Sequence, residues 1–360
     1  MDKYIDNYND SKKVTYHEQT DISNILKLRA VLKTLPDFCK DYFRAMDPLT
    51  TTKTRISYAY DIRIFFQFLL DENPAFKDYS MKDFTVDVLD QLKAIDIEEY
   101  QEYLKVYKNG DKTETNGERG LKRKISALRS FYAYYYKHEF IQTNPTVLVD
   151  VPKTHEKNII RLDADEVAML LDHIEHCGDE LTGQKRVYYE KTKERDLAIV
   201  TLLLGTGIRV SECVGLDVED VDFKNNGIKV TRKGGNEMVV YFGYEVEKAL
   251  KKYLEVRKNI VPVAGHEHAL FYSTQRKRIG IQAVENLVKK YAGAITTTKK
   301  ITPHKLRSTY GTTLYQETGD IYLVADVLGH RDVNTTKKHY AAMDDARRRK
   351  AATAVHLRED

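Results

Sequence analysis

The sequence predicts a mainly α-helical fold of two domains, in which a helical N-terminal domain precedes a mixed α/β domain with a small antiparallel β-hairpin or sheet. Three observations favour this fold class. Apolar residues recur at intervals of three and four through most of the chain, as on the buried face of a helix. One short stretch instead alternates on both sides of Gly234-Gly235-Asn236, which is typical of a hairpin. The length of 360 residues suffices for two hydrophobic cores and for few more.

The first half of the chain opens with a polar stretch that lacks periodicity, so we assign residues 1–20 to a flexible tail. Residues 21–150 are predicted to form a helical domain without strands. Its clearest helix runs from Thr52 to Leu70, where apolar residues recur at spacings of 4, 3 and 4, and Asn73-Pro74 ends it. Two further helices are expected around residues 89–104 and 125–135. Residues 151–161 are assigned to an interdomain linker because they combine Pro152 with basic residues and no helical period.

The second domain, residues 162–360, is predicted to open with a helix that begins after Asp163, an N-cap residue. A charged stretch at about 178–194 is expected to interrupt the helices before the apolar helix Leu197–Leu204, which Gly205-Thr206-Gly207 ends. The hairpin strands are expected at 228–233 and 238–242. Further helices are predicted at 244–258, 281–292, 304–317, 321–328, 333–340 and 344–356.

Composition excludes several classes of protein. The longest apolar run, Ala198–Leu204, is far shorter than the roughly 20 residues of a membrane-spanning helix, and no signal-peptide core is visible, so a cytoplasmic protein is expected. The three cysteines Cys39, Cys177 and Cys213 form no C-x-x-C pair, which argues against a disulfide framework or a structural zinc site. A metal-dependent nuclease would need clustered carboxylates or closely spaced histidines, and the sequence has neither. We therefore expect no metal.

Basic residues gather locally although the net charge is only +4, with 58 Lys and Arg against 54 Asp and Glu. Such clusters are typical of contacts with the phosphates of nucleic acid, and a solvated helix face explains any one of them about as well. The residues that we expect to contact DNA lie at the start of the helix that continues through 125–135 and in the linker: Arg119, Lys122, Arg123, Lys153 and Lys157.

Several residues of the second domain have the chemistry that a phosphate group requires. Arg209 follows a Gly-Thr-Gly turn, and His304 and Arg307 lie three residues apart on one predicted helix. Two arginine forks can hold one phosphate bidentately, which suits the transition state of phosphoryl transfer. Glu212, one turn beyond Arg209, is expected to orient that guanidinium.

Three more residues complete this set. Lys233 at the hairpin turn can donate a proton to a leaving oxygen, and His330 after Leu328-Gly329 can bond a phosphate oxygen. Tyr340 follows Lys337-Lys338-His339, cations that favour formation of a phenolate from a phenol with a usual pKa of about 10. Taken singly, each residue is better explained by an ordinary structural role. Tyr340, for example, is one of 25 tyrosines in the chain, and a tyrosine usually packs in the core with its hydroxyl hydrogen-bonded.

The order of these residues resembles the signature of the tyrosine recombinase, or phage integrase, family. The similarity lies in Gly205-Thr-Gly-Ile-Arg209-Val-Ser-Glu212, then His304-Lys-Leu-Arg307, then Leu328-Gly-His330, then Tyr340. The resemblance implies an active site of six residues, all present here: Arg209, Lys233, His304, Arg307, His330 and Tyr340. Residues 35–42 and 54–70 are similar to the helical core-binding domain of Xer-like two-domain members, which implies that residues 21–150 bind DNA and that 162–360 form the catalytic domain.

The resemblance also implies a mechanism and partners. Tyr340 would form a 3′-phosphotyrosine with DNA, Arg209, Arg307 and His330 would stabilise the transition state, Lys233 would protonate the 5′ oxygen and His304 would tune proton transfer. Strand exchange would pass through a Holliday junction without ATP, metal or other cofactor. The partners implied are double-stranded DNA with specific recombination sites and three further copies of the chain, in a homotetramer packed through a C-terminal helix at 346–357.

Alternatives remain open from the sequence. The biological role stays open, because integration and excision of a mobile element, Xer-type resolution of dimers and DNA inversion all use the same active site. The long charged stretch 178–194 and the Ser308-Thr-Tyr310 that follows Arg307 differ from simple Xer enzymes. A DNA-binding regulator without catalysis and a type IB-like topoisomerase are the other functions considered. The 346–357 helix is equally compatible with docking on its own domain.

Overall fold

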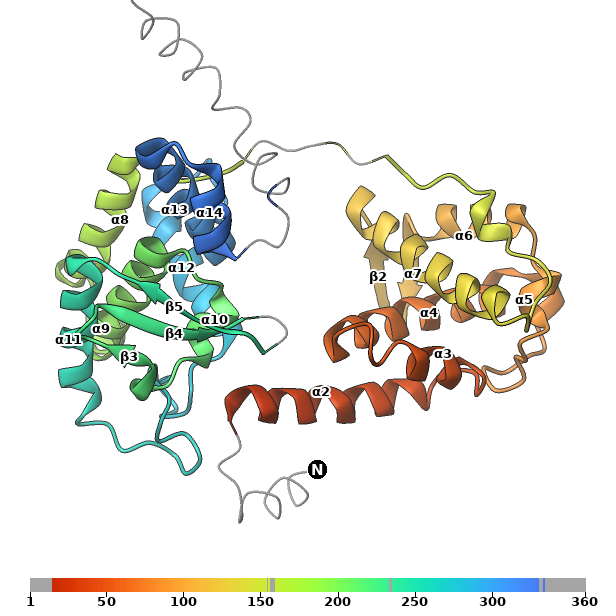
Figure 1. Ribbon diagram of the computed structural model, residues 1–360, viewed down its shortest axis with the longest axis horizontal. Helices are drawn as coiled ribbons and strands as arrows, with labels where there is room; N and C mark the ends of the chain where they lie inside the picture. The colour runs from red at the N-terminus through yellow and green to blue at the C-terminus, as the bar shows by residue number, and fades with distance from the viewer. Residues whose placement is uncertain (1–14, 154, 156–158, 233–234, 330–332, 334–360) are drawn as a thin grey trace, which may run out of the picture. The chain divides into compact units, whose positions relative to one another are not determined.

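The computed structural model describes residues 15–153, 155, 159–232, 235–329 and 333. The chain divides into two compact units, Met1–Lys157 and Asn158–Asp360, and the boundary falls inside the stretch 151–161 (Figure 1). Helices predominate in both units and the strands form two small antiparallel sheets, so the predicted fold class is confirmed. No described helix is long and apolar enough to cross a lipid bilayer.

The N-terminal unit is built from helices around an aromatic core. Helix α4 carries Phe65 and Phe66 on its buried face, and these rings contact Tyr100 and Phe131 edge to face. The fully buried Tyr132 of α7 donates to the carbonyl of Leu89 at 3.4 Å. The α-helices of this unit are α2 (Tyr16–Leu32), α3 (Cys39–Ala45), α4 (Thr52–Glu72), α5 (Val88–Gln91), α6 (Ala94–Tyr103) and α7 (Glu118–Lys137).

Three local features of this unit differ from the sequence prediction. The helix expected around 89–104 is divided into α5 and α6, because Leu92 and Lys93 between them have extended backbone and the Lys93 N–H is capped by the Asp96 carboxylate at 2.7 Å. Helix α2 begins at Tyr16, so residues 16–20 are helical and not part of a tail, because Thr15 and Glu18 form a capping box that starts the helix. A hairpin of β1 (Val106–Asn109) and β2 (Lys112–Thr115) stands where no strand was expected. Only Tyr107 of its eight strand residues is buried, so the apolar alternation that indicates a strand is missing.

The C-terminal unit is built around helix α9, whose second half is mostly buried. Helix α9 packs against α8, α11 and α13 (Figure 1). All residues of its segment 198–203 are buried. A sheet with the strand order β3-β4-β5 lies in the same unit. Its elements are α8 (Ala164–His176), α9 (Gly183–Thr206), α10 (Val210–Gly215), β3 (Val221–Asp222), β4 (Gly227–Thr231), β5 (Glu237–Tyr241), α11 (Tyr244–Arg257), α12 (Ile281–Ile295), α13 (Pro303–Thr318) and α14 (Ile321–Leu328).

The charged stretch at 178–194 does not interrupt the helices, contrary to the prediction, because most of it forms the first half of α9. Its charges are accommodated on the exposed side, while Tyr189 is buried and donates to the carbonyl of Glu175 at 2.6 Å. The helices predicted at 244–258, 281–292, 304–317 and 321–328 correspond to α11 to α14. Those predicted at 333–340 and 344–356 lie, apart from Val333, outside the described residues.

Candidate active site

The turn between α9 and α10 places Arg209. Gly207 ends α9 in the left-handed region at φ 62°, and a Cβ there would lie 2.3 Å from the Tyr310 ring and 3.0 Å from Leu328 Cδ2. Only glycine fits, because both the backbone angle and the space exclude a side chain. The close approach brings the turn between α9 and α10 against Tyr310 of α13 and Leu328 of α14. Arg209 follows as the N-cap residue of α10.

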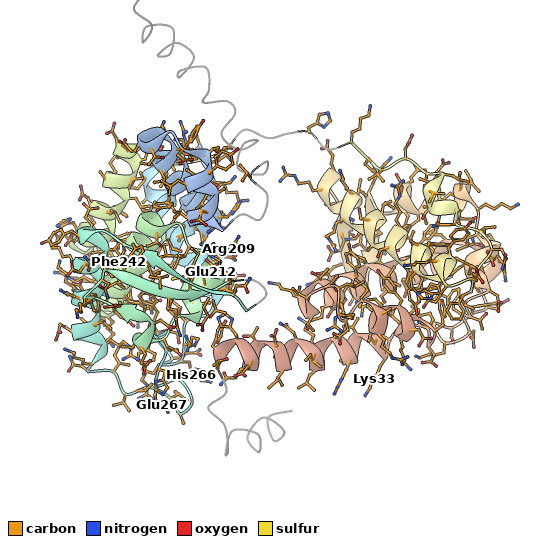
Figure 2. The ribbon with its side chains drawn as sticks, viewed as in Figure 1. Lys33, Arg209, Glu212, Phe242, His266 and Glu267 are labelled. Carbon is orange, nitrogen blue, oxygen red and sulfur yellow. The ribbon has the colours of Figure 1, made fainter. Side chains whose placement is uncertain are left out.

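Glu212 orients the side chain of Arg209. Its carboxylate accepts from the Arg209 backbone N–H and from the Arg209 Nη1, both at 2.8 Å. The Glu212 side chain is only 5% exposed and that of Arg209 is 37% exposed, so the ion pair joins a buried carboxylate to a guanidinium that still reaches the surface. Figure 2 shows the two side chains next to each other. A charge-assisted pair of this kind restricts the directions in which the guanidinium can point.

Arg307 brings α13 to the same place. It is 5% exposed, and its two Nη atoms donate to the carbonyls of Gly207 and Leu328. Arg209 Nη2 donates to the neighbouring carbonyl of Gly329 at 3.4 Å. Two arginines that are far apart in the sequence therefore converge on two adjacent turns, one before α10 and one after α14.

A third arginine, which the sequence analysis did not single out, reaches this cluster from the hairpin. Arg232 directly follows β4, and its Nη1 and Nη2 donate to the carbonyls of Asp326 and Val327 at 3.3 and 2.6 Å. Burial lowers the pKa of Arg232; the carboxylate of Glu212 opposes this shift and the cation of Arg209 adds to it. The only signal for Arg232 in the sequence was that it directly precedes Lys233. Many residues at solvent-exposed turns lie beside a lysine, so this signal did not mark Arg232 as part of the site.

The remaining members of the predicted site are less closely placed or lie outside the description. His304 is exposed in the first turn of α13, whereas Arg307 one turn later is buried, so their side chains occupy different environments. The carbonyl of His304 accepts from Ser308 Oγ at 3.0 Å. Lys233, His330, Tyr340, Lys157 and the segment 346–357 lie outside the described residues.

The basic residues predicted to contact DNA differ in their surroundings. Arg119 and Lys122 of α7 and Lys153 are exposed. Arg123 is 46% exposed but forms an ion pair with Asp61, whose side chain is 2% exposed and lies 3.6 Å from Lys124 Nζ. Burial raises the pKa of Asp61, and the two cations oppose that shift. Arg123 is therefore partly occupied in stabilising the N-terminal unit.

Known proteins resemble this chain over most of its length. The phage integrase family model matches residues 160–347. The tyrosine recombinase XerC of Caldanaerobacter subterraneus subsp. tengcongensis is 33% identical over 315 residues, which cover 84% of this chain and 82% of that protein. The tyrosine recombinase XerS of Lactococcus lactis subsp. cremoris is 31% identical over 338 residues, or 88% of this chain and 93% of that protein.

Solved structures share the fold. The integrase of transposon Tn1549 in complex with a circular intermediate DNA aligns with a TM-score of 0.62 at 21% identity, over 88% of this chain and 98% of that one. The XerH site-specific recombinase bound to its difH substrate aligns with a TM-score of 0.60 at 20% identity, over 84% and 79%. The family match and the identity over most of the length lead to one conclusion. The chain belongs to the phage integrase family of tyrosine recombinases.

Proposed function

We propose that this chain is a site-specific DNA recombinase that cuts and rejoins DNA strands through a 3′-phosphotyrosine at Tyr340 and a Holliday junction. The observation that carries the proposal is the convergence of Arg209 and Arg307, from separate helices, on the turns at 207 and 328–329. This convergence joins two motifs that the sequence separates. It also brings together the two groups best suited to a scissile phosphate.

The electrostatics of the described cluster favour an anion. The buried carboxylate of Glu212 accepts from Arg209 and acts on the charge of Arg232, while Arg307 donates to the carbonyls of the two turns beside Arg209. The excess positive charge lies partly away from bulk water, where its attraction for a phosphate is stronger than at an open surface. The forks of Arg209 and Arg307 are proposed to bind the nonbridging oxygens and to stabilise the pentavalent transition state.

The proposed chemistry conserves atoms and charge. The phenolate of Tyr340 forms a bond to phosphorus while the bond from phosphorus to the 5′ oxygen breaks, and Lys233 transfers its proton to that oxygen. The 5′ hydroxyl of a partner strand then attacks the phosphotyrosine, its proton returns to Lys233, and Tyr340 leaves as the phenolate, which restores the phosphodiester. His330 is proposed to bond a phosphate oxygen and His304 to tune the proton transfers. No net hydrolysis occurs, so no nucleotide is consumed.

Double-stranded DNA with specific sites is the proposed partner. Support comes from the XerH structure bound to difH and from a lambda integrase dimer bound to a core site, which aligns with a TM-score of 0.59 at 18% identity. We propose that residues 21–150 bind DNA, with Arg119, Lys122 and Lys153 on phosphates, and that 162–360 form the catalytic domain. A homotetramer joined through 346–357 and a cytoplasmic location complete the proposal. The proposed biological role is movement of a mobile element or Xer-type resolution.

The deciding experiment is a covalent-adduct assay. Nicked suicide duplexes drawn from the DNA that flanks the gene are incubated in EDTA with wild type and with Tyr340→Phe, and products are separated on a denaturing gel. We expect a protein-linked strand with wild type alone. Binding without any adduct would favour a DNA-binding regulator, and relaxation of supercoiled plasmids of any sequence would favour a topoisomerase.

A further inference from the structure

The C-terminal end of α14 is a meeting point for arginines. The last carbonyls of a helix lack partners within the helix and carry the negative end of its dipole. Here four consecutive carbonyls, 326 to 329, each accept from an arginine side chain. Arg232 donates to the carbonyls of Asp326 and Val327. Arg307 donates to the carbonyl of Leu328, and Arg209 donates to that of Gly329. Three separate elements are thereby held at one helix end.

Two of these arginines are proposed to bind the phosphate oxygens, and the third, Arg232, is assigned no contact with the phosphate. Arg232 lies where the hairpin leaves β4, and Lys233 is the next residue of the chain. Consecutive Cα atoms are about 3.8 Å apart, so whatever fixes Arg232 also limits the backbone from which Lys233 extends. On the other side of the contact, α14 leads through Gly329 to His330 in the sequence.

The contact is closely fitted. A Cβ on Gly329, whose φ is +62°, would lie 1.8 Å from Arg232 Nη1, so the guanidinium lies directly against the backbone of the glycine. Two Nη atoms of one planar group reach two successive carbonyls. A lysine has a single nitrogen at the end of a flexible chain and cannot reproduce this fork. The residue type, and not merely the charge, is therefore required.

We infer that Arg232 is a positioning residue for catalysis: by binding the last carbonyls of α14, it holds the β4–β5 hairpin beside Arg209 and Arg307, so that Lys233 can protonate the leaving 5′ oxygen. The inference rests on the proposed function, in which Lys233 is the general acid. Loss of Arg232 then impairs one step, the departure of the 5′ oxygen, more than the binding of DNA or the stabilisation of charge on phosphorus.

The test replaces the leaving atom. In a suicide duplex with sulfur in place of the bridging 5′ oxygen, the leaving group is a thiolate, whose conjugate acid has a pKa of about 8.5 and which departs without a proton. Full-length Arg232→Met is expected to cleave the oxygen substrate about 10- to 100-fold more slowly than wild type, part of the ~10²–10⁴-fold that general acids contribute, and the sulfur substrate at nearly the wild-type rate. Lys233→Ala is expected to show the same rescue.

A matched control separates positioning from stability. Arg257 of α11 likewise binds backbone carbonyls, those of Glu267 at 2.7 Å and Ala269 at 2.8 Å, and Figure 2 shows Glu267 well away from Arg209. Arg257→Met should lower thermal stability without any difference between the two substrates. Arg232→Lys, which keeps the charge, provides a second variant should Arg232→Met fail to fold, and its rescue by sulfur is expected as well.

The outcomes are distinct. An equal loss on both substrates for Arg232→Met or Arg232→Lys would overturn the positioning role. Failure of sulfur to rescue Lys233→Ala would overturn the general-acid assignment and the inference with it. Absence of an adduct from wild type on both substrates would instead overturn the proposed function itself.

Discussion

Gly329→Ala is the substitution whose effect the structure defines most sharply. The new Cβ would lie 1.8 Å from Arg232 Nη1, so the guanidinium must leave the carbonyls of Asp326 and Val327. Gly265→Ala is a matched control, because its φ of +83° is also left-handed while nothing lies within 4 Å of the added Cβ. The control isolates the backbone cost from the loss of the arginine contact.

The magnitudes differ measurably. A non-glycine residue in the left-handed region costs about 1–2 kcal/mol, which is the expected loss for Gly265→Ala. Hydrogen bonds to a charged group contribute about 1.5–3 kcal/mol each, and water replaces part of that for a side chain near the surface. Gly329→Ala is therefore expected to lower the free energy of unfolding by about 3–5 kcal/mol in total.

The assay is hydrogen exchange of the α9 amides in the full-length protein, followed by mass spectrometry, together with urea unfolding curves. The core segment of α9 exchanges through global opening of the C-terminal unit, so its protection reports that unit's stability. Cleavage of suicide duplexes by the same variants gives the catalytic effect, which we expect for Gly329→Ala alone. Equal losses of stability for the two variants would refute the reasoning, because the clash with Arg232 would then contribute nothing.

Three further predictions follow from the described contacts. Glu212→Gln keeps the shape of the side chain but weakens its hold on Arg209, so single-turnover cleavage should slow by about 10- to 100-fold with DNA affinity nearly unchanged, as gel-shift titration would show. Asp61→Ala leaves the cations around it without their buried partner and should cost about 3–5 kcal/mol in urea unfolding; a loss below 1 kcal/mol would contradict a buried ion pair. Lys122→Met should reduce DNA affinity and make the negative slope of log affinity against log salt less steep by about one. Arg123→Met should act mainly on stability, because Arg123 is paired with Asp61. Identical salt slopes for the two variants would exclude this division of roles.

The sequence by itself determined the fold class and the family. Helical periodicity is a local property, so the helices α11 to α14 could be predicted from short windows of residues. The ordered motifs around Arg209, Arg307 and Tyr340 could be read for the same reason, since each is a short run of residues with a characteristic spacing. Signals were weakest where burial was slight, as in the exposed β1–β2 hairpin, or where charged residues continued a helix, as in the first half of α9.

Only the tertiary structure decided which of these residues meet. The tie between Arg232 and the carbonyls of α14 spans 94 and 95 positions of the chain, and the pairing of Arg123 with Asp61 spans 62. No local pattern marks the partner of either arginine, because an Arg in a turn or on a helix looks the same in sequence whether it faces water, DNA or a distant part of the fold. Which partner an arginine contacts depends on distances between segments that are far apart in the chain. Those distances are set by the packing of the whole fold, and a local stretch of sequence does not reveal them.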